Sequence, residues 1–233
     1  VQGESEYYAS FFFKAPWGEK EVQGFAFKSL IDNPKVVHHW ILYGVGNDTS
    51  QQDGAVAADP AHLLPTTLPG EMFIAGWAPG QGDTKYPQSL GLYMPRGKQA
   101  MLRLEIHYNN VTSTKKESDR SGVEFCVSNK KRGAEVATHW LGQTTFNVPA
   151  HTRQDVVGTC VPKLEGGPVR VLSMTPHMHQ TGVHAKAVLK RASGEEVTLL
   201  DQPFAFGDQH SIAVPEDRSI PEVVVKQGDR IVT

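Results

Sequence analysis

The sequence predicts an all-β protein built from two jelly-roll-like antiparallel β-sandwich domains. Short runs of β-branched and aromatic residues recur along the chain, and turns rich in Gly and Pro separate them. No stretch of convincing length repeats its apolar residues with the 3.6-residue period of a helix. At 233 residues, the chain is long enough for two sandwich domains of ordinary size.

The first half of the chain contains the most regular strand patterns. In residues 101–109, Leu102, Leu104 and Ile106 alternate with other residues, so one face is apolar and the opposite face ends in His107. Residues 46–70 are rich in Gly, Asp, Ala, Pro and Thr and predict a long loop. Strands are expected at Tyr7–Lys14, Val22–Leu30, Val36–Tyr43, Glu71–Trp77, 91–97 (with a turn), Met101–Asn109 and 121–129.

The strand pattern restarts after a basic turn at residues 130–133, which places the domain boundary there. The first domain is expected over 1–135 and the second over 136–233. The chain begins at Val1 without a Met and stops inside a strand pattern, so we expect a processed or truncated product with an incomplete second domain. Further strands are expected at 136–143, 155–160, 169–173, 184–191, 196–200, 211–214, 222–226 and 231–233.

Composition and charge exclude several classes of function. The net charge of −2 gives no electrostatic support for a nucleic-acid partner, and no apolar run is long enough to span a bilayer. Cys126 and Cys160 are too few for a disulfide scaffold, so they pair with each other or one pairs with a cysteine outside the chain. Asn47 and Asn110 begin Asn-x-Thr triplets, which makes them candidate glycan acceptors in a secretory pathway.

Five of the histidines are candidate metal ligands. His177 and His179, spaced i, i+2, would share one face of a strand and could hold a metal ion together, although two ordinary strand histidines show the same spacing. His38 and His39 are neighbours, so both can reach one metal only where the strand is irregular or ends. His107 is a candidate third ligand for this pair, or a structural histidine.

Imidazole-rich ligation suits copper or zinc, and the Irving–Williams order favours copper. None of the five histidines lies on a predicted helix, which excludes the helical zinc-protease pattern. The two cysteines lack Cys-x-x-Cys spacing, which excludes a zinc ribbon. The other histidines are interpreted as structural or surface residues: His62, His139, His151, His184 and His210.

Three motifs together resemble the copper type II, ascorbate-dependent monooxygenases. They are Val-His-His-Trp at 37–40, Leu-Glu-Ile-His-Tyr-Asn-Asn at 104–110 and His-Met-His-Gln-Thr-Gly at 177–182. Ala-Gly-Trp-Ala at 75–78 and Gly-Asp-Arg-Ile at 228–231 agree in order and spacing. The resemblance covers the chain from about residue 20 to its end, and the second motif looks closer to the dopamine β-monooxygenase branch.

The resemblance implies two sandwich domains that face a cleft, each with one copper ion. His38, His39 and His107 match the ligands of the copper that stores and delivers an electron. His177 and His179 match two ligands of the copper where O₂ binds and the substrate C–H bond is broken, so these two are the implied catalytic residues. Ascorbate is the implied reductant, the substrate is a small molecule, and the implied location is secreted or lumenal. Protein partners are left open.

Two positions depart from the family pattern. The family takes a methionine ligand for the second copper, and the usual partner of Cys160, from a Glu-Met-Cys-like segment that would follow the last residue here. Met174 and Met178 match that ligand poorly. Thr175 stands where the peptide-hydroxylating branch has a substrate-binding Arg, which argues against a peptidylglycine substrate.

The predicted function is therefore a copper- and ascorbate-dependent monooxygenase that hydroxylates an unactivated C–H bond. The alternative is a non-catalytic extracellular structural or binding module that keeps the fold, because the sequence lacks the methionine segment. A zinc hydrolase at the three-histidine site is a further alternative, in which Glu105 shares a strand face with His107 without being placed by the sequence as a general base.

Overall fold

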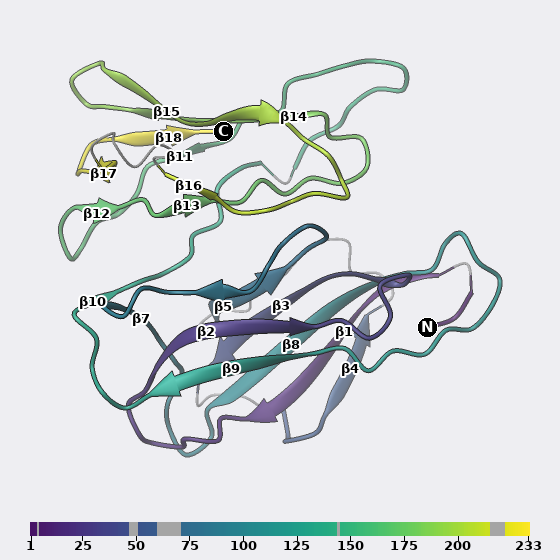
Figure 1. The fold of residues 1–233 in the computed structure, drawn as a ribbon. Coiled ribbons are helices and arrows are strands. Elements are labelled where there is room, and N and C mark those ends of the chain that lie inside the picture. The colour runs from purple at the N-terminus through teal and green to yellow at the C-terminus, as the bar shows by residue number, and fades with distance from the viewer. Residues whose placement is uncertain (4, 47–50, 60–70, 144, 215–221) are drawn as a thin grey trace. The chain divides into compact units, whose positions relative to one another are not determined.

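The all-β class is confirmed by the structure, a computed structural model that describes residues 1–3, 5–46, 51–59, 71–143, 145–214 and 222–233. These residues form eighteen strands and no helix (Figure 1). Accordingly, they include no helical segment that could cross a membrane. The chain divides into two compact units, with unit 1 at Val1–Ala78 and Gly82–His139 and unit 2 at Pro79–Gln81 and Trp140–Thr233.

Unit 1 is a sandwich of two sheets (Figure 1). The first sheet has the order β4-β1-β8-β3-β5 and is antiparallel throughout. Its strands are β1 (Glu6–Lys14), β3 (Val37–Val45), β4 (Val56–Asp59), β5 (Met72–Trp77) and β8 (Met101–Asn109). In the second sheet, β10-β7-β2-β6 with β9 also paired to β2, only the β10–β7 pair is parallel. Its strands are β2 (Gln23–Leu30), β6 (Thr84–Lys85), β7 (Leu90–Tyr93), β9 (Gly122–Ser128) and β10 (Ala134–Glu135).

The core of unit 1 lies between these sheets. Leu104 and Ile106 of β8 and Trp40 of β3 share one buried cluster with Phe27 and Leu92 of the second sheet. Burying each such side chain contributes roughly 1.5–3 kcal/mol. The opposite faces of β3 and β8 are buried as well, so the polar face predicted for β8 lies inside the protein.

Unit 2 has one four-stranded sheet of order β11-β18-β14-β15 and two separate strand pairs, β12–β17 and β13–β16. Its core gathers Leu189, Leu200, Ile212, Val225 and Ile231. Most of its strands are very short: β11 (Thr159–Cys160), β12 (Val169–Arg170), β13 (Ser173–Met174), β14 (His184–Lys190), β15 (Glu196–Pro203), β16 (Ile212–Ala213), β17 (Val224–Val225) and β18 (Arg230–Val232).

Some sequence predictions of strands and loops are wrong. Residues 136–143 form no strand, and Trp140 is 50% exposed, because β-propensity needs a neighbouring strand to pair with. In contrast, β4 forms inside the segment predicted to be a loop, because it pairs with the edge of β1. Cys126 lies on β9 and Cys160 on β11, and both are free thiols, so the expected pairing with each other is wrong, whereas a cysteine partner outside the chain stays a prediction. Asn47 and His62 lie outside the described residues.

The side chain of Asn110 is expected to carry no glycan. It is 4% exposed, and its Nδ2 donates hydrogen bonds of 2.9 Å to the carbonyl oxygens of Gln2 and Lys115. A sugar on Nδ2 would replace a donor hydrogen and would need space that the fold fills. Glycopeptide mass mapping of the protein made in eukaryotic cells checks this. Stoichiometric modification at Asn110 would contradict it.

Candidate metal centres

An irregularity in β3 lets two adjacent histidines face the same way. The register between β3 and β8 shifts between Val37 and His39, and His39 pairs directly with His107. A β-bulge of this kind turns one extra side chain, here that of His38, toward the face where its neighbour already points. The sequence argument required such a break in the strand, and the structure contains it.

The imidazoles of His38, His39 and His107 are buried, and one ring nitrogen from each lies within 4.8 Å of the others. The Nδ1 of His38 is 2.8 Å from the Nδ1 of His107 and 3.1 Å from the Nδ1 of His39. Three neutral nitrogen donors that converge on one point fit a copper or zinc ion. Among the described residues, this is the one group of three or more potential ligands.

Strand β1 holds the ring of His107 from two sides. Tyr8, directly opposite His107 in the sheet, stacks on it with ring centres 4.2 Å apart and planes at 3°. A carboxylate oxygen of Glu6 lies 2.8 Å from Nε2, the ring nitrogen that does not face the other histidines. A carboxylate on the outer nitrogen of a ligand histidine orients the ring and raises its basicity. Burial, together with the charges of Glu105 and Glu6, raises the pKa of Tyr8, so its phenol stays protonated at neutral pH.

A buried ionic network occupies the same face of the sheet. Arg103 donates to both carboxylate oxygens of Glu71, at 2.8 and 2.7 Å, and to Glu105 at 2.6 Å. Its guanidinium also lies 4.3 Å from the centre of the Tyr43 ring. Burial alone would lower the pKa of Arg103, but the two carboxylates outweigh this effect and raise it. The Glu105 carboxylate therefore pairs with Arg103, and this pairing argues against Glu105 as the general base of a zinc hydrolase.

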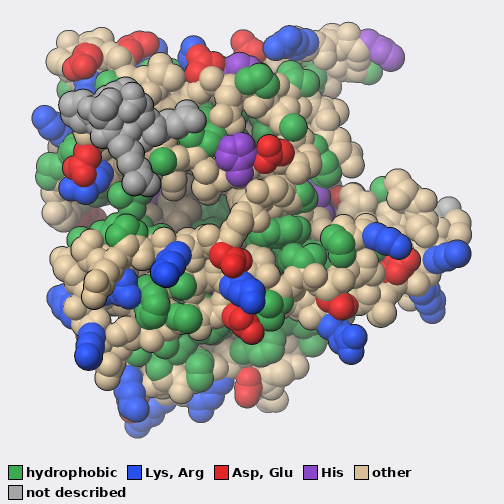
Figure 2. Space-filling model, in the orientation of Figure 1, with side chains coloured by type: hydrophobic (Ala, Val, Ile, Leu, Met, Phe, Trp, Pro, Cys, Tyr) green, Lys and Arg blue, Asp and Glu red, His purple; other side chains and the backbone are tan. Residues whose placement is uncertain are grey.

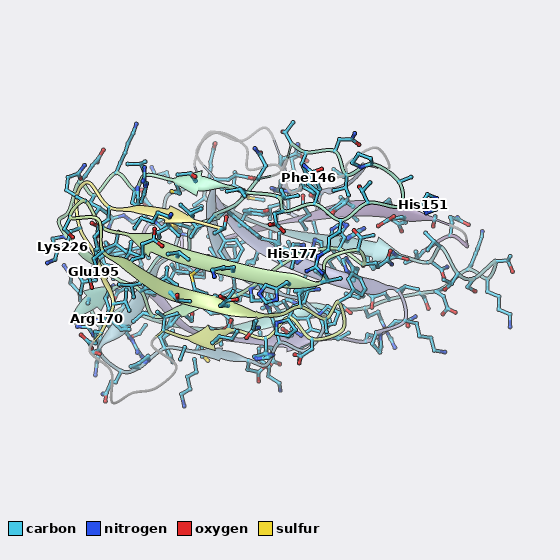
Figure 3. All side chains as sticks on the ribbon, turned by 90° about the horizontal axis from the view of Figure 1, so that it is seen from above. Phe146, His151, Arg170, His177, Glu195 and Lys226 are labelled. Atoms are coloured by element: carbon cyan, nitrogen blue, oxygen red, sulfur yellow. The ribbon has the colours of Figure 1, made fainter. Side chains whose placement is uncertain are left out.

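The second predicted pair, His177 and His179, lies in unit 2, just after β13. The expected regular strand is wrong here: β13 ends at Met174, and Pro176 has no N–H to continue the ladder. The two rings nevertheless stay close, with centres 5.6 Å apart and planes at 84°. Figure 3 shows His177 toward the opposite end of unit 2 from Glu195 and Lys226.

Gln209, which contacts His177, was not predicted from the sequence. The side-chain carbonyl of Gln209 lies 2.7 Å from the Nδ1 of His177. Desolvation lowers the pKa of His177 and the charge of His179 acts in the same direction, whereas the hydrogen bond to Gln209 opposes them. The net effect favours the neutral imidazole that a metal ion requires.

The two nearby methionines, Met174 and Met178, make packing contacts. Met174 packs against the core of unit 2. Met178 folds over Gly182, where an added Cβ would come within 2.9 Å of its sulfur atom. Both side chains thus make packing contacts, and their poor match to the family's methionine ligand stays a prediction.

The remaining described histidines lie on the surface, which is one of the two interpretations, structural or surface, given from the sequence. His139 and His151 are exposed. His184 pairs with Asp201 at 2.8 Å and His210 with Asp208 at 2.7 Å. On the face drawn in Figure 2, basic and acidic side chains are interspersed.

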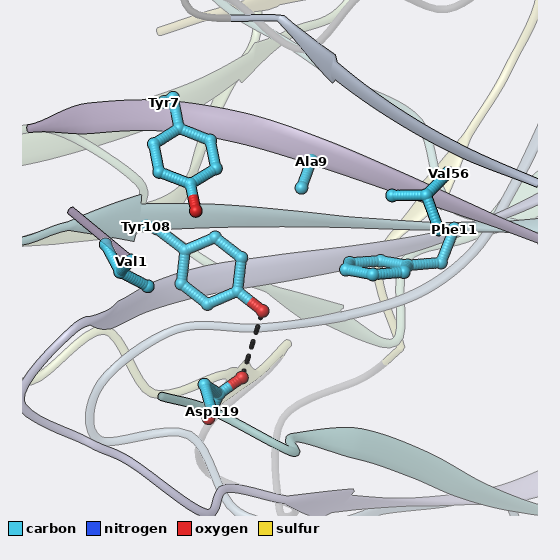
Figure 4. Close-up of a pocket in the computed structure, with 7 residues that line it drawn as sticks. All are labelled: Val1, Tyr7, Ala9, Phe11, Val56, Tyr108 and Asp119. Carbon is cyan, nitrogen blue, oxygen red and sulfur yellow. Dashed lines mark hydrogen bonds between the residues drawn. The ribbon is translucent and has the colours of Figure 1, made fainter. Parts of the chain in front are cut away.

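A cavity of about 250 Å³ is a separate feature of unit 1. Tyr7, Ala9 and Tyr108 line it, from the opposite faces of β1 and β8 to those of Tyr8 and His107 (Figure 4). Tyr108 donates to Asp119 at 3.0 Å, and the same carboxylate accepts from Ser121. The Tyr108 hydroxyl in this cavity therefore holds the loop that carries Asp119.

Comparison with known proteins identifies one family for the first half of the chain. Residues 1–115 match the N-terminal domain of copper type II ascorbate-dependent monooxygenases. The resemblance to this family is thus confirmed for residues 1–115. The metal of this family is copper, and three converging imidazole nitrogens fit a copper ion.

Individual relatives cover more of the chain. DBH-like monooxygenase protein 2 of Mus musculus is 26% identical over 96% of this chain and 38% of its own length. Dopamine beta-hydroxylase of Homo sapiens is 29% identical over 69% of the chain and 27% of its own length. Tyramine beta-hydroxylase of Caenorhabditis briggsae is 30% identical over 64% and 27%. The chain thus spans well under half the length of these relatives.

Proposed function

We propose that this chain is part of a copper- and ascorbate-dependent monooxygenase that hydroxylates an unactivated C–H bond of a small molecule. The observation that carries the proposal is the convergence of three buried Nδ1 atoms, from His38, His39 and His107, in a domain of this family. The overall reaction takes R–H, O₂, two electrons from ascorbate and two protons, and yields R–OH and water.

The two histidine groups have separate roles in this proposal. Bound copper supplies one-electron redox chemistry and reaction with O₂. His38, His39 and His107 would hold the ion that stores an electron, in a buried setting where Tyr8 stacks on His107 and Glu6 lies beside it. His177 and His179 would hold the ion at which O₂ and the substrate react. One copper is thus expected in each unit.

The relatives narrow the choice of substrate. They are named for dopamine and tyramine, so an arylethylamine is a sensible first class to test. Thr175 in place of a carboxylate-binding Arg disfavours a peptide with a free terminal carboxylate. The oxidising, copper-supplied location that fits this chemistry is the secretory pathway or the extracellular space.

The test uses the full-length protein that contains this chain, produced by secretion and loaded with copper. We expect about two copper ions per chain and O₂ uptake that requires both ascorbate and a substrate from an arylethylamine panel. His177→Ala should lower product formation by more than about 100-fold while the three-histidine site keeps its metal. Binding of zinc with no affinity for copper would contradict the proposal.

A non-catalytic extracellular module is the second candidate. It is favoured by one observation, the packing of both nearby methionines, Met174 against the core of unit 2 and Met178 against Gly182. The same experiment separates the two candidates. Copper bound only at the three-histidine site, with no O₂ uptake across the panel, would favour the module.

A further inference from the structure

The side chain of Gln209 is completely buried, at 0% exposure, which is unusual for a residue that carries both a donor and an acceptor. Such a group is costly unless every polar atom is satisfied. Its backbone N–H donates to the carbonyl of Pro79 at 2.8 Å. Gly80 permits this approach, because an added Cβ at Gly80 would lie 3.0 Å from the same nitrogen. The residue is therefore held firmly where it meets His177.

The hydrogen bonds of Gln209 fix which way its amide points. Its Nε2 donates to the carbonyl oxygen of Phe206 at 3.0 Å. A carbonyl oxygen only accepts, so the NH₂ group must face Phe206, and the side-chain oxygen must face His177. That oxygen also only accepts, so the hydrogen in the 2.7 Å contact belongs to the Nδ1 of His177.

A neutral imidazole carries one N–H, so a hydrogen on Nδ1 leaves the lone pair on Nε2. We propose that Gln209 is the positioning residue of this pair: it holds His177 in the Nδ1–H tautomer and thereby makes Nε2 the atom that binds metal. This inference rests on the proposed function for its purpose, although the tautomer is a property of the metal-free protein. The arrangement differs from that of the first group, where Nδ1 atoms converge.

Two substitutions separate this role from a structural one. Gln209→Leu removes both the acceptor for His177 and the donor to Phe206. Gln209→Glu, when ionised, also removes the donor to Phe206 but keeps an acceptor for the Nδ1–H of His177. If loss of the Phe206 hydrogen bond causes the effect, Gln209→Leu and Gln209→Glu should change His177 and its metal affinity equally. If loss of the acceptor for His177 causes it, only Gln209→Leu should show the change.

The first readout is the tautomer of His177 in the metal-free full-length protein, from long-range ¹H–¹⁵N correlation spectra assigned with His177→Ala. We expect the Nδ1–H form in the wild type and in Gln209→Glu, and a mixture of tautomers in Gln209→Leu. A wild-type ring protonated on Nε2, or an unchanged ring in Gln209→Leu, would overturn the inference.

The second readout is Cu(I) affinity, measured with His107→Ala in the background so that only the second site is titrated. Loss of an outer partner of a ligand histidine costs about 10–100-fold in metal affinity, which is the effect expected for Gln209→Leu. Equal losses in the two Gln209 variants would count against the positioning role. If His177→Ala leaves copper binding unchanged, the proposed metal role of the pair is wrong. The tautomer of His177 is still decided by the spectra of the metal-free protein.

Discussion

Replacing His107 with alanine is expected to abolish metal binding at the three-histidine centre and to leave the second centre loaded. The variant removes one of three converging nitrogens and also the ring that Tyr8 and Glu6 hold in place. The affinity of the first centre should therefore fall by more than the roughly 100-fold that follows loss of an outer partner alone. The measurement is metal content after dialysis, combined with Cu(I) titration against a competing chelator.

His139→Ala is the matched control, because His139 also belongs to unit 1 but is exposed. It should retain full metal content. The interpretation of the centre would be wrong if His107→Ala bound as much copper as the control. Thermal unfolding of both variants in the metal-free state shows whether a change in metal content follows from loss of the fold.

The three-histidine centre could be predicted in outline because its motifs lie on long, well-patterned strands. The alternation in residues 101–109 already placed His107 opposite the apolar face, and the two adjacent histidines implied an irregular strand. The partner strands could not be predicted. Glu6 and Tyr8 share a face of β1 by simple alternation, but nothing local in the sequence says that β1 pairs with β8.

The second half was harder to predict for a physical reason. Its strands are mostly two residues long, so they depend on tertiary pairing and lack a periodic pattern of their own. Pro176 was a usable signal that the strand ends before His177, because proline cannot donate to a sheet ladder. Gln209 carried no such signal, since only its burial and its contacts across 32 residues distinguish it from a surface glutamine.

The centre also depends on the stability of the sheet face that carries it. Arg103, Glu105 and His107 follow one another on the same face of β8. The charged side chains of this network are buried, with exposed fractions of 4% for Arg103, 1% for Glu71 and 3% for Glu105. Removing one partner of a buried ion pair leaves an uncompensated charge, which costs far more than the pair itself contributes.

Arg103→Met is accordingly expected to destabilise unit 1 by about 3–5 kcal/mol, because two buried carboxylates lose their cation. Arg96→Met is the matched control. It breaks the Arg96–Glu21 pair, whose side chains are 57% and 49% exposed, and should stay within about 1 kcal/mol of the wild type. Denaturant unfolding of the metal-free protein measures both. Equal loss of unfolding free energy in the two variants would show that the buried network contributes no more to stability than the exposed pair.

The pH dependence of Arg103→Met gives an independent check on the cause. Without the guanidinium, the folded variant holds two carboxylates close together in a buried place, where uptake of a proton relieves their burial and mutual repulsion. The folded variant then binds more protons than its unfolded chain, so its stability rises as the pH falls. The difference from the wild type should therefore be smaller at about pH 5 than at about pH 8. A cavity left by the shorter side chain would cost the same at both pH values, so a pH-independent loss would assign the effect to packing instead of charge.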